Sequence, residues 1–176
     1  MTRRHIRAIV VIAASAFAVS LTLAAQDRAS VKVPDGLALS DFKGYETWQT
    51  IAPSETDEGM KAILGNSVMM DAYKAGIPAN ATAVPDGAMM AKLEWSKKSN
   101  DKSPYAVTVP DKLKSASFMV KDAKRFAASG GWGYAQFAYD SASDTFKPSG
   151  NGSGCGYACH TRVKARDFVF TSYARR

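Results

Sequence analysis

The chain has 176 residues and a formal net charge of +7, and its proportions of hydrophobic (46%) and charged (22%) residues are typical of a globular protein. It contains neither a run of lysines nor a basic stripe interleaved with aromatic residues, so we expect no nucleic-acid partner. Three of the 23 lysines and arginines lie in residues 1–25, which leaves 20 basic against 16 acidic side chains in the rest of the chain. This small excess is compatible with a solvated surface or with electrostatic steering towards an acidic redox partner.

Residues 1–25 have the layout of a secretory signal peptide. Arg3, Arg4 and Arg7 are followed by an apolar run that ends in "LTLAA", which is the expected order of a positive region, an apolar region and a small-residue cleavage site. The alternative is an uncleaved anchor, because an apolar run of about 18 residues can just span a bilayer. The small residues at the end favour cleavage, so we expect a periplasmic protein that does not contact the membrane once the signal peptide is removed.

The segments that follow predict one domain built of strands and short helices. We expect residues 26–44 to form a loosely ordered N-terminal segment. Residues 45–52 (YETWQTIA) predict a strand, because aromatic and β-branched residues favour strands. Residues 66–76 predict a helix, because Asn66 is a good N-cap and Gly76 is a typical end signal.

A second strand is predicted at residues 88–98 (AMMAKLEWSKK), directly after the turn "PDG". Side chains of a strand alternate between its two faces, which places Leu93 and Trp95 on one face and Lys92 on the other. The face that carries Lys92 is expected to border either a pocket or solvent.

The rest of the chain predicts further short elements. They are a strand at 115–120, a short helix at 121–129, an aromatic strand at 132–140 and a flexible Ser/Gly-rich loop at 140–154. Together the segments predict an α+β fold, with a mostly antiparallel β-sheet covered by a few short helices.

Both cysteines of the chain lie near its C-terminus, where Cys155 and Cys159 are separated by three residues and His160 follows directly. The usual haem-attachment signal has two intervening residues. In one interpretation both thiols, or Cys159 alone, bond covalently to haem c and His160 binds its iron, with Gly156 allowing the extra residue to bulge out. The alternatives are a disulfide that closes a small loop and a zinc site, which needs four ligands.

His160 is the only histidine that remains if the signal peptide is removed, because the other one, His5, lies in it. Ligation of one haem by two histidines of the same chain is therefore excluded. The sixth position of the iron is then vacant or holds water, methionine or lysine. Only 16 residues follow His160, whereas an ordinary class-I cytochrome c builds its fold behind an N-terminal motif, so a five-coordinate iron with an open position is preferred.

Four segments of the chain carry a family resemblance. They are "MKAILGNSVMMDAYKAG", "PDGAMMAKLEW", "ASFMVKDAKRFAASGGWGYAQF" and "CHTRVKARDFVFTSY". In this order and spacing they resemble the cytochrome P-460 family, which includes the cytochromes c′-β, over residues 45–173. The resemblance implies a mostly antiparallel β domain at residues 45–176, one haem c near the C-terminus, a homodimer and an open site for hydroxylamine, nitrogen oxides or carbon monoxide.

The resemblance also implies roles for three side chains. Lys92 stands where the family places a lysine that is bonded to the porphyrin in the hydroxylamine-oxidising members, and the alternative is an ordinary exposed lysine. Those members have a distal carboxylate that accepts protons, for which a rate gain of roughly 10²–10⁴ is typical. The corresponding segment here offers only Asp140 and Asp144, and the alternative for both is to organise turns.

The predicted function is that of a periplasmic haem c protein with one haem, which binds and oxidises hydroxylamine or related nitrogen oxides. A periplasmic electron acceptor, such as a cytochrome c, would then be its redox partner. The first alternative is a protein that binds nitric oxide or carbon monoxide without turnover. The second is an electron carrier with a methionine on the iron.

Overall fold

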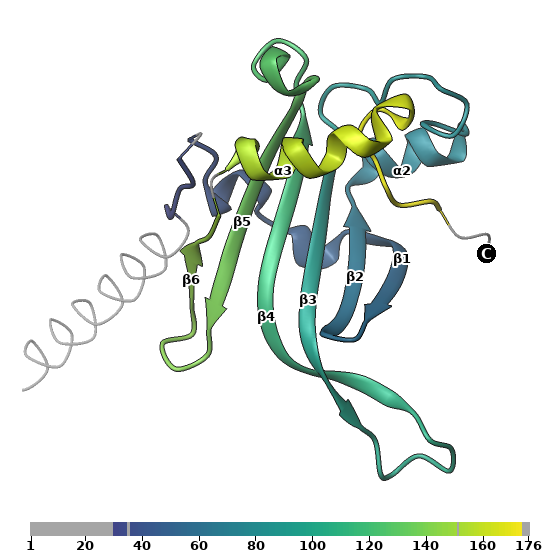
Figure 1. Cartoon of the computed structure of the whole chain (residues 1–176), viewed down its shortest axis with the longest axis vertical. Helices are drawn as coiled ribbons and strands as arrows, with labels where there is room; N and C mark the ends of the chain where they lie inside the picture. The colour runs from purple at the N-terminus through teal and green to yellow at the C-terminus, as the bar shows by residue number, and fades with distance from the viewer. Residues whose placement is uncertain (1–29, 35, 151, 174–176) are drawn as a thin grey trace, which may run out of the picture.

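The computed structural model of the chain describes residues 30–34, 36–150 and 152–173, so the predicted signal peptide lies outside the described residues. The described residues form a six-stranded sheet of order β1-β2-β3-β4-β5-β6 (Figure 1), in which each strand pairs antiparallel with the next strand in sequence. The predicted α+β fold with a mostly antiparallel sheet and a few short helices is confirmed.

The elements have the following bounds. The strands are β1 (Gln49–Thr56), β2 (Gly59–Gly65), β3 (Met89–Ser99), β4 (Thr108–Lys121), β5 (Trp132–Asp140) and β6 (Thr145–Pro148). The α-helices are α2 (Ser67–Lys74) and α3 (Ser153–His160), and short 3-10 helices are formed by Leu39–Phe42, Tyr45–Thr47, Ala127–Ser129 and Thr161–Arg166.

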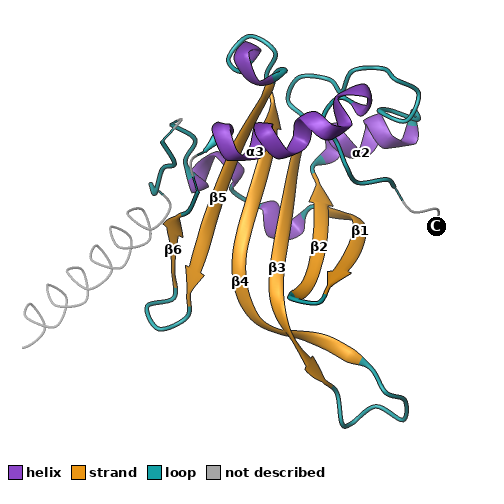
Figure 2. Cartoon of the chain, viewed as in Figure 1, coloured by secondary structure: helices purple, strands orange, loops and turns teal. Residues whose placement is uncertain are grey.

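The two faces of the sheet bury different parts of the chain. Alternation along β4 sends Met119 to a cluster that includes residues of α2 and of the C-terminal segment, and Phe118 to a cluster that includes the N-terminal segment. On β5, Trp132 and Tyr134 belong to the first cluster and Phe137 to the second. In Figure 2, α3 crosses the first face of the sheet.

The predicted helix at residues 66–76 is confirmed as α2, and its N-cap also fixes a strand. The Asn66 side chain accepts hydrogen bonds from the backbone N–H groups of Met69 and Met89, both at 3.0 Å. It therefore caps the helix and ties it to the first residue of β3. The buried side of α2, which contains Met69, Met70 and Tyr73, packs on the first face of the sheet.

The described part of the N-terminal segment is packed, so the expectation of a loosely ordered segment at residues 26–44 is wrong for it. Val33, Leu37 and Phe42 are buried, and the Phe42 ring stacks on Phe118 at a centroid distance of 4.3 Å. The physical reason is that the second face of the sheet is apolar and this segment covers it.

Other boundaries also differ from the prediction, and the strand predicted at 115–120 begins earlier, as β4 at Thr108. Residues 45–47 form a 3-10 helix and the strand begins only at Gln49. The short helix predicted at 121–129 is reduced to the 3-10 helix at Ala127–Ser129. Before it the chain forms a turn, in which the Asp122 side chain accepts hydrogen bonds from the backbone of Lys124 and Arg125. The loop predicted at 140–154 contains β6 and the start of α3, and the strand is favoured by the cross-strand contact between Tyr139 and Phe146.

We predict that Phe42→Ala lowers the free energy of unfolding by about 3–5 kcal/mol, because this ring is 1% exposed and stacks on Phe118. Chemical denaturation measures the change. The control is Tyr105→Ala in the β3–β4 loop, where the side chain is 78% exposed, so the change should stay within about 0.5 kcal/mol. Equal losses in the two variants would mean that the N-terminal segment does not contribute to the core.

Candidate functional site

The two cysteines and the histidine lie on α3, whose packing depends on a glycine. Residues 155 and 159 are four apart, so Cys155 and Cys159 share one side of the helix. A Cβ atom on Gly156 would lie 2.4 Å from Cγ of Tyr134 on β5. Gly156 is therefore needed for the close approach of α3 to the sheet, and the three-residue spacing is a helical turn rather than the predicted bulge. Both cysteines are free and exposed.

A cavity of about 760 Å³ lies between α3, the first face of the sheet and the C-terminal segment. Its size is within the range of cofactor and ligand sites. Apolar side chains that line it include Ile63, Met90, Met119, Val169 and Phe170. Cys155, Cys159, His160 and Lys92 line the same cavity, so the structure brings these four predicted site residues together.

His160 is held with one ring nitrogen available for a ligand bond. Its Nδ1 lies 2.7 Å from the carbonyl oxygen of Phe168. A carbonyl only accepts hydrogen bonds, so Nδ1 carries the proton and the lone pair is on Nε2. The ring contacts those of Tyr134 and Phe170, at centroid distances of 5.1 and 4.9 Å.

Burial lowers the pKa of His160 below its ordinary value of 6.5. The hydrogen bond to Phe168 acts in the opposite direction, and the positive charge of Lys92 lowers the pKa further. The imidazole is consequently neutral at pH 7, which is the form that binds a metal ion.

Lys92 belongs to a row of side chains that crosses the sheet on the cavity side. The strand register aligns Ile63 with Lys92, Lys92 with Ser117, and Ser117 with Gln136, and all four residues line the cavity. The sequence was compatible with Lys92 facing either a pocket or solvent, and the structure places Lys92 in the lining of the cavity. Ser117 and Gln136 were missed by the sequence analysis, because their alignment with Lys92 depends on the register of three strands.

Asp140 and Asp144 are not brought to the cavity. Asp140, at the end of β5, accepts a hydrogen bond from the Lys147 ammonium at 2.7 Å and another from the backbone N–H of Ala142. These two hydrogen bonds lower the pKa of Asp140 to about 2. Asp144 accepts a hydrogen bond from the Tyr139 hydroxyl at 2.7 Å. Figure 1 shows the β5–β6 turn at the end of the sheet away from α3. Both aspartates organise this turn, which was the alternative interpretation.

The C-terminal wall of the cavity is fixed by groups that the sequence did not point to. The Arg166 guanidinium donates hydrogen bonds to the carbonyl oxygens of Phe170 and Thr171 and to Oγ of Ser172, at 3.2, 3.4 and 2.9 Å. The Tyr73 hydroxyl of α2 donates to the carbonyl of Thr171 at 2.8 Å. The wall therefore depends on contacts between segments far apart in sequence.

Two further findings concern the described part of the chain only. None of its helices combines the length and the apolar character that crossing a membrane requires. Residues 30–173, apart from the undescribed positions 35 and 151, contain no group of three or more His, Cys, Asp or Glu side chains arranged to hold a metal ion. The zinc alternative therefore receives no support from these residues.

The fold and the site define a class of protein: an antiparallel sheet with a largely apolar cavity, beside a helix that presents two cysteines and a neutral imidazole. The family model of Cytochrome P460 matches residues 42–171, and the chain belongs to this family. Family membership makes it a haem-binding cytochrome. A search of curated proteins finds no match to the chain.

The described residues fit a haem. The cavity presents apolar side chains of three strands to a flat, mostly apolar macrocycle, and His160 offers Nε2, which is the usual kind of axial ligand for haem iron. Cys155 and Cys159 lie at the edge of the same cavity. Side chains of the cavity would therefore supply both a packing surface and an axial ligand to a bound haem.

We predict that Gly156→Ala moves α3 off β5 and costs about 1–3 kcal/mol of unfolding free energy, which is typical of overpacking. The added Cβ would overlap the Tyr134 ring. Gly154→Ala, in the same helix, is the matched control, because a Cβ there meets no atom within 4 Å. Thermal denaturation of the two purified variants measures the difference, and equal midpoints would contradict the close packing of the helix.

Proposed function

We propose that this chain is an exported haem c protein with one haem, in which Cys155 and Cys159 form the thioether bonds and Nε2 of His160 binds the iron. The observation that carries the proposal is the shared cavity: His160, with its other nitrogen engaged by Phe168, lines the same space as both cysteines. When bound, haem supplies an iron that binds small nitrogen compounds and exchanges electrons.

The side chains of the cavity support a site for a small nitrogen oxide. Lys92, Ser117 and Gln136 provide hydrogen-bond donors in one row across the sheet, while the rest of the lining is largely apolar. A mostly apolar lining with a few polar groups can hold and orient a small polar ligand. The primary function that we propose is therefore the binding of nitric oxide or a related compound.

Oxidation of hydroxylamine is the second candidate, and one observation favours it. Lys92, which stands at the position of the porphyrin-linked lysine of oxidising relatives, lines the cavity together with His160. Turnover also needs a proton acceptor, and the described residues that line the cavity include no Asp or Glu. The cavity lining therefore favours the binding of a nitrogen oxide over the oxidation of hydroxylamine. In the oxidation case a periplasmic electron acceptor, such as a cytochrome c, would be the partner.

The proposal extends to assembly and location. We propose a homodimer in the periplasm, on the basis of the family and of the signal-peptide layout of residues 1–25. Size-exclusion chromatography with light scattering gives the oligomeric state of the holoprotein.

We predict that Cys155→Ala retains covalent haem through Cys159, and that the double variant Cys155→Ala/Cys159→Ala retains none. The reason is that the two thiols lie one helical turn apart at the same cavity. Mass spectrometry of protein matured with a cytochrome c assembly system counts the attached haem. A wild-type protein with the mass of the bare polypeptide would overturn the proposal. Proteolytic digestion of the same sample shows whether Lys92 carries a bond to the porphyrin.

We predict that Asp140→Asn and Asp144→Asn leave nitric oxide affinity and any hydroxylamine-dependent reduction of a dye unchanged within about twofold. Loss of a true general base would cost roughly 10²–10⁴ in rate, but both carboxylates are engaged in the β5–β6 turn. Optical titration with nitric oxide and a steady-state dye assay measure the two quantities. A loss above about 100-fold in dye reduction would assign the missing base to this turn and favour the oxidase.

A further inference from the structure

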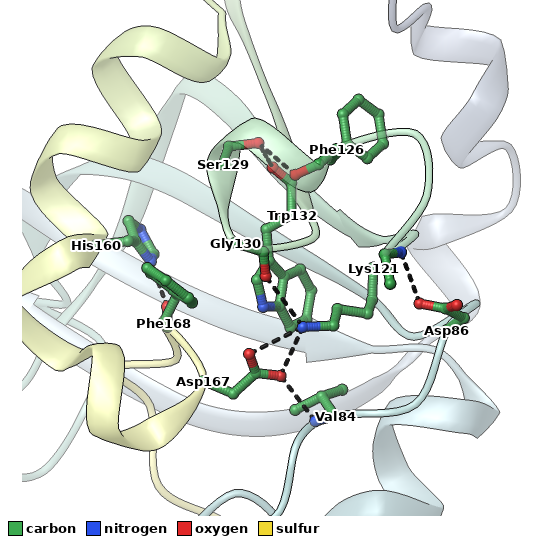
Figure 3. A network of polar contacts seen from close by, with 11 residues as sticks. Val84, Asp86, Lys121, Phe126, Ser129, Gly130, Trp132, His160, Asp167 and Phe168 are labelled. Atoms are coloured by element: carbon green, nitrogen blue, oxygen red, sulfur yellow. Dashed lines mark hydrogen bonds and ion pairs between the residues drawn. The ribbon is translucent and has the colours of Figure 1, made fainter.

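A buried ion pair lies outside the cavity, close to the turn that contacts His160. Nζ of Lys121 donates to both carboxylate oxygens of Asp167, at 2.8 and 2.9 Å, and the two side chains are 7% and 12% exposed. Figure 3 shows that the carboxylate also accepts from the backbone N–H of Val84, at 2.7 Å, and that the ammonium also donates to the carbonyl of Gly130, at 3.3 Å. A buried pair of this kind adds little net stability over apolar residues, so stability alone does not explain it.

The ion pair holds a turn with an uncommon backbone conformation. Asp167 and Phe168 have φ values of 47° and 63°, in the left-handed region that residues other than glycine rarely occupy. Backbone hydrogen bonds from Asp167 to Lys164 and from Phe168 to Val163, at 3.0 and 3.1 Å, close the turn. Strain of this kind persists only where surrounding contacts enforce it, and the contacts of the Asp167 carboxylate are such contacts.

The turn directs one carbonyl group at the histidine. Phe168 follows Asp167 directly, its side chain is buried against Gly130, and its carbonyl oxygen lies 2.7 Å from Nδ1 of His160. A displacement of the Asp167 backbone would therefore move the acceptor of the His160 hydrogen bond. The partner of the second nitrogen of a metal-bound histidine fixes the ring orientation and raises the basicity of the ligand.

We propose that Lys121 and Asp167 are positioning residues, which hold the Phe168 carbonyl on Nδ1 of His160 and so set the strength of the bond between this imidazole and the haem iron. The inference depends on the proposed haem function of His160. Lys121 comes from β4, Val84 from the loop before β3 and Asp167 from the C-terminal segment. The strength of the iron–imidazole bond would therefore depend on contacts among these three segments.

The test uses the holoprotein and two substitutions that each remove one charge, Asp167→Asn and Lys121→Met. Resonance Raman spectroscopy of the ferrous state reports the iron–histidine stretching frequency, and a redox titration reports the reduction potential. We expect a lower frequency and a more positive potential in both variants, because a displaced acceptor makes the imidazole a weaker donor. Lys121→Arg retains the positive charge and should show the iron–histidine frequency of the wild type.

Controls separate positioning from stability. Lys97→Met removes another ion pair, in which Nζ lies 3.0 Å from Oε1 of Glu55, and it should leave the frequency unchanged. If a single variant does not fold, the double variant Lys121→Met/Asp167→Asn leaves no unpaired buried charge and should still show the shift. Wild-type frequencies and potentials in the folded variants would overturn the inference.

The outcome for the wild-type protein tests the proposed function independently. A wild-type holoprotein without an iron–histidine band would contradict His160 as the iron ligand, and with it the proposed function. If the wild type shows the iron–histidine band and the Asp167 and Lys121 variants show it at the same frequency, only the positioning role is contradicted.

Discussion

The close approach of α3 to β5 at Gly156 is the constraint on which the rest of the site depends. Because no side chain separates the helix backbone from the Tyr134 ring, Cys155, Cys159 and His160 are held at the mouth of a cavity whose far side is the sheet. A larger residue would lift the helix and move all three groups together. A single small residue therefore sets the distance between the attachment helix and the surface that faces it.

The site combines two kinds of environment. The cavity is largely apolar, which suits a flat macrocycle. Outside the cavity, His160 is hydrogen-bonded to the Phe168 carbonyl, and the neighbouring Asp167 forms an ion pair with Lys121. Low exposure strengthens the electrostatic interactions among these groups. Burial of His160 itself lowers its pKa and favours the neutral imidazole.

Much of the fold could be predicted because its signals are local. Helix α2 follows from the Asn66 cap, and β3 and β5 follow from alternating and aromatic residues. Elements with weak local signals were predicted less well. Strand β6 is a short edge strand in a polar segment, and the short helix predicted at 121–129 is replaced over most of its length by a turn that the Asp122 side chain stabilises. The N-terminal segment was misjudged because its packing depends on the face of the sheet that it covers.

The sequence by itself determined the chemical groups of the site: two cysteines four residues apart, one adjacent histidine, and a lysine on the opposite face of a strand from Leu93. Only the tertiary structure decided which of them share a cavity. It placed Lys92, Ser117 and Gln136 in the same cavity as His160 and left Asp140 and Asp144 at the far turn. It also formed the Asp167–Lys121 pair outside this cavity. The physical reason is that strand register and buried charge pairing join residues that are far apart in the chain, and no local pattern records such contacts.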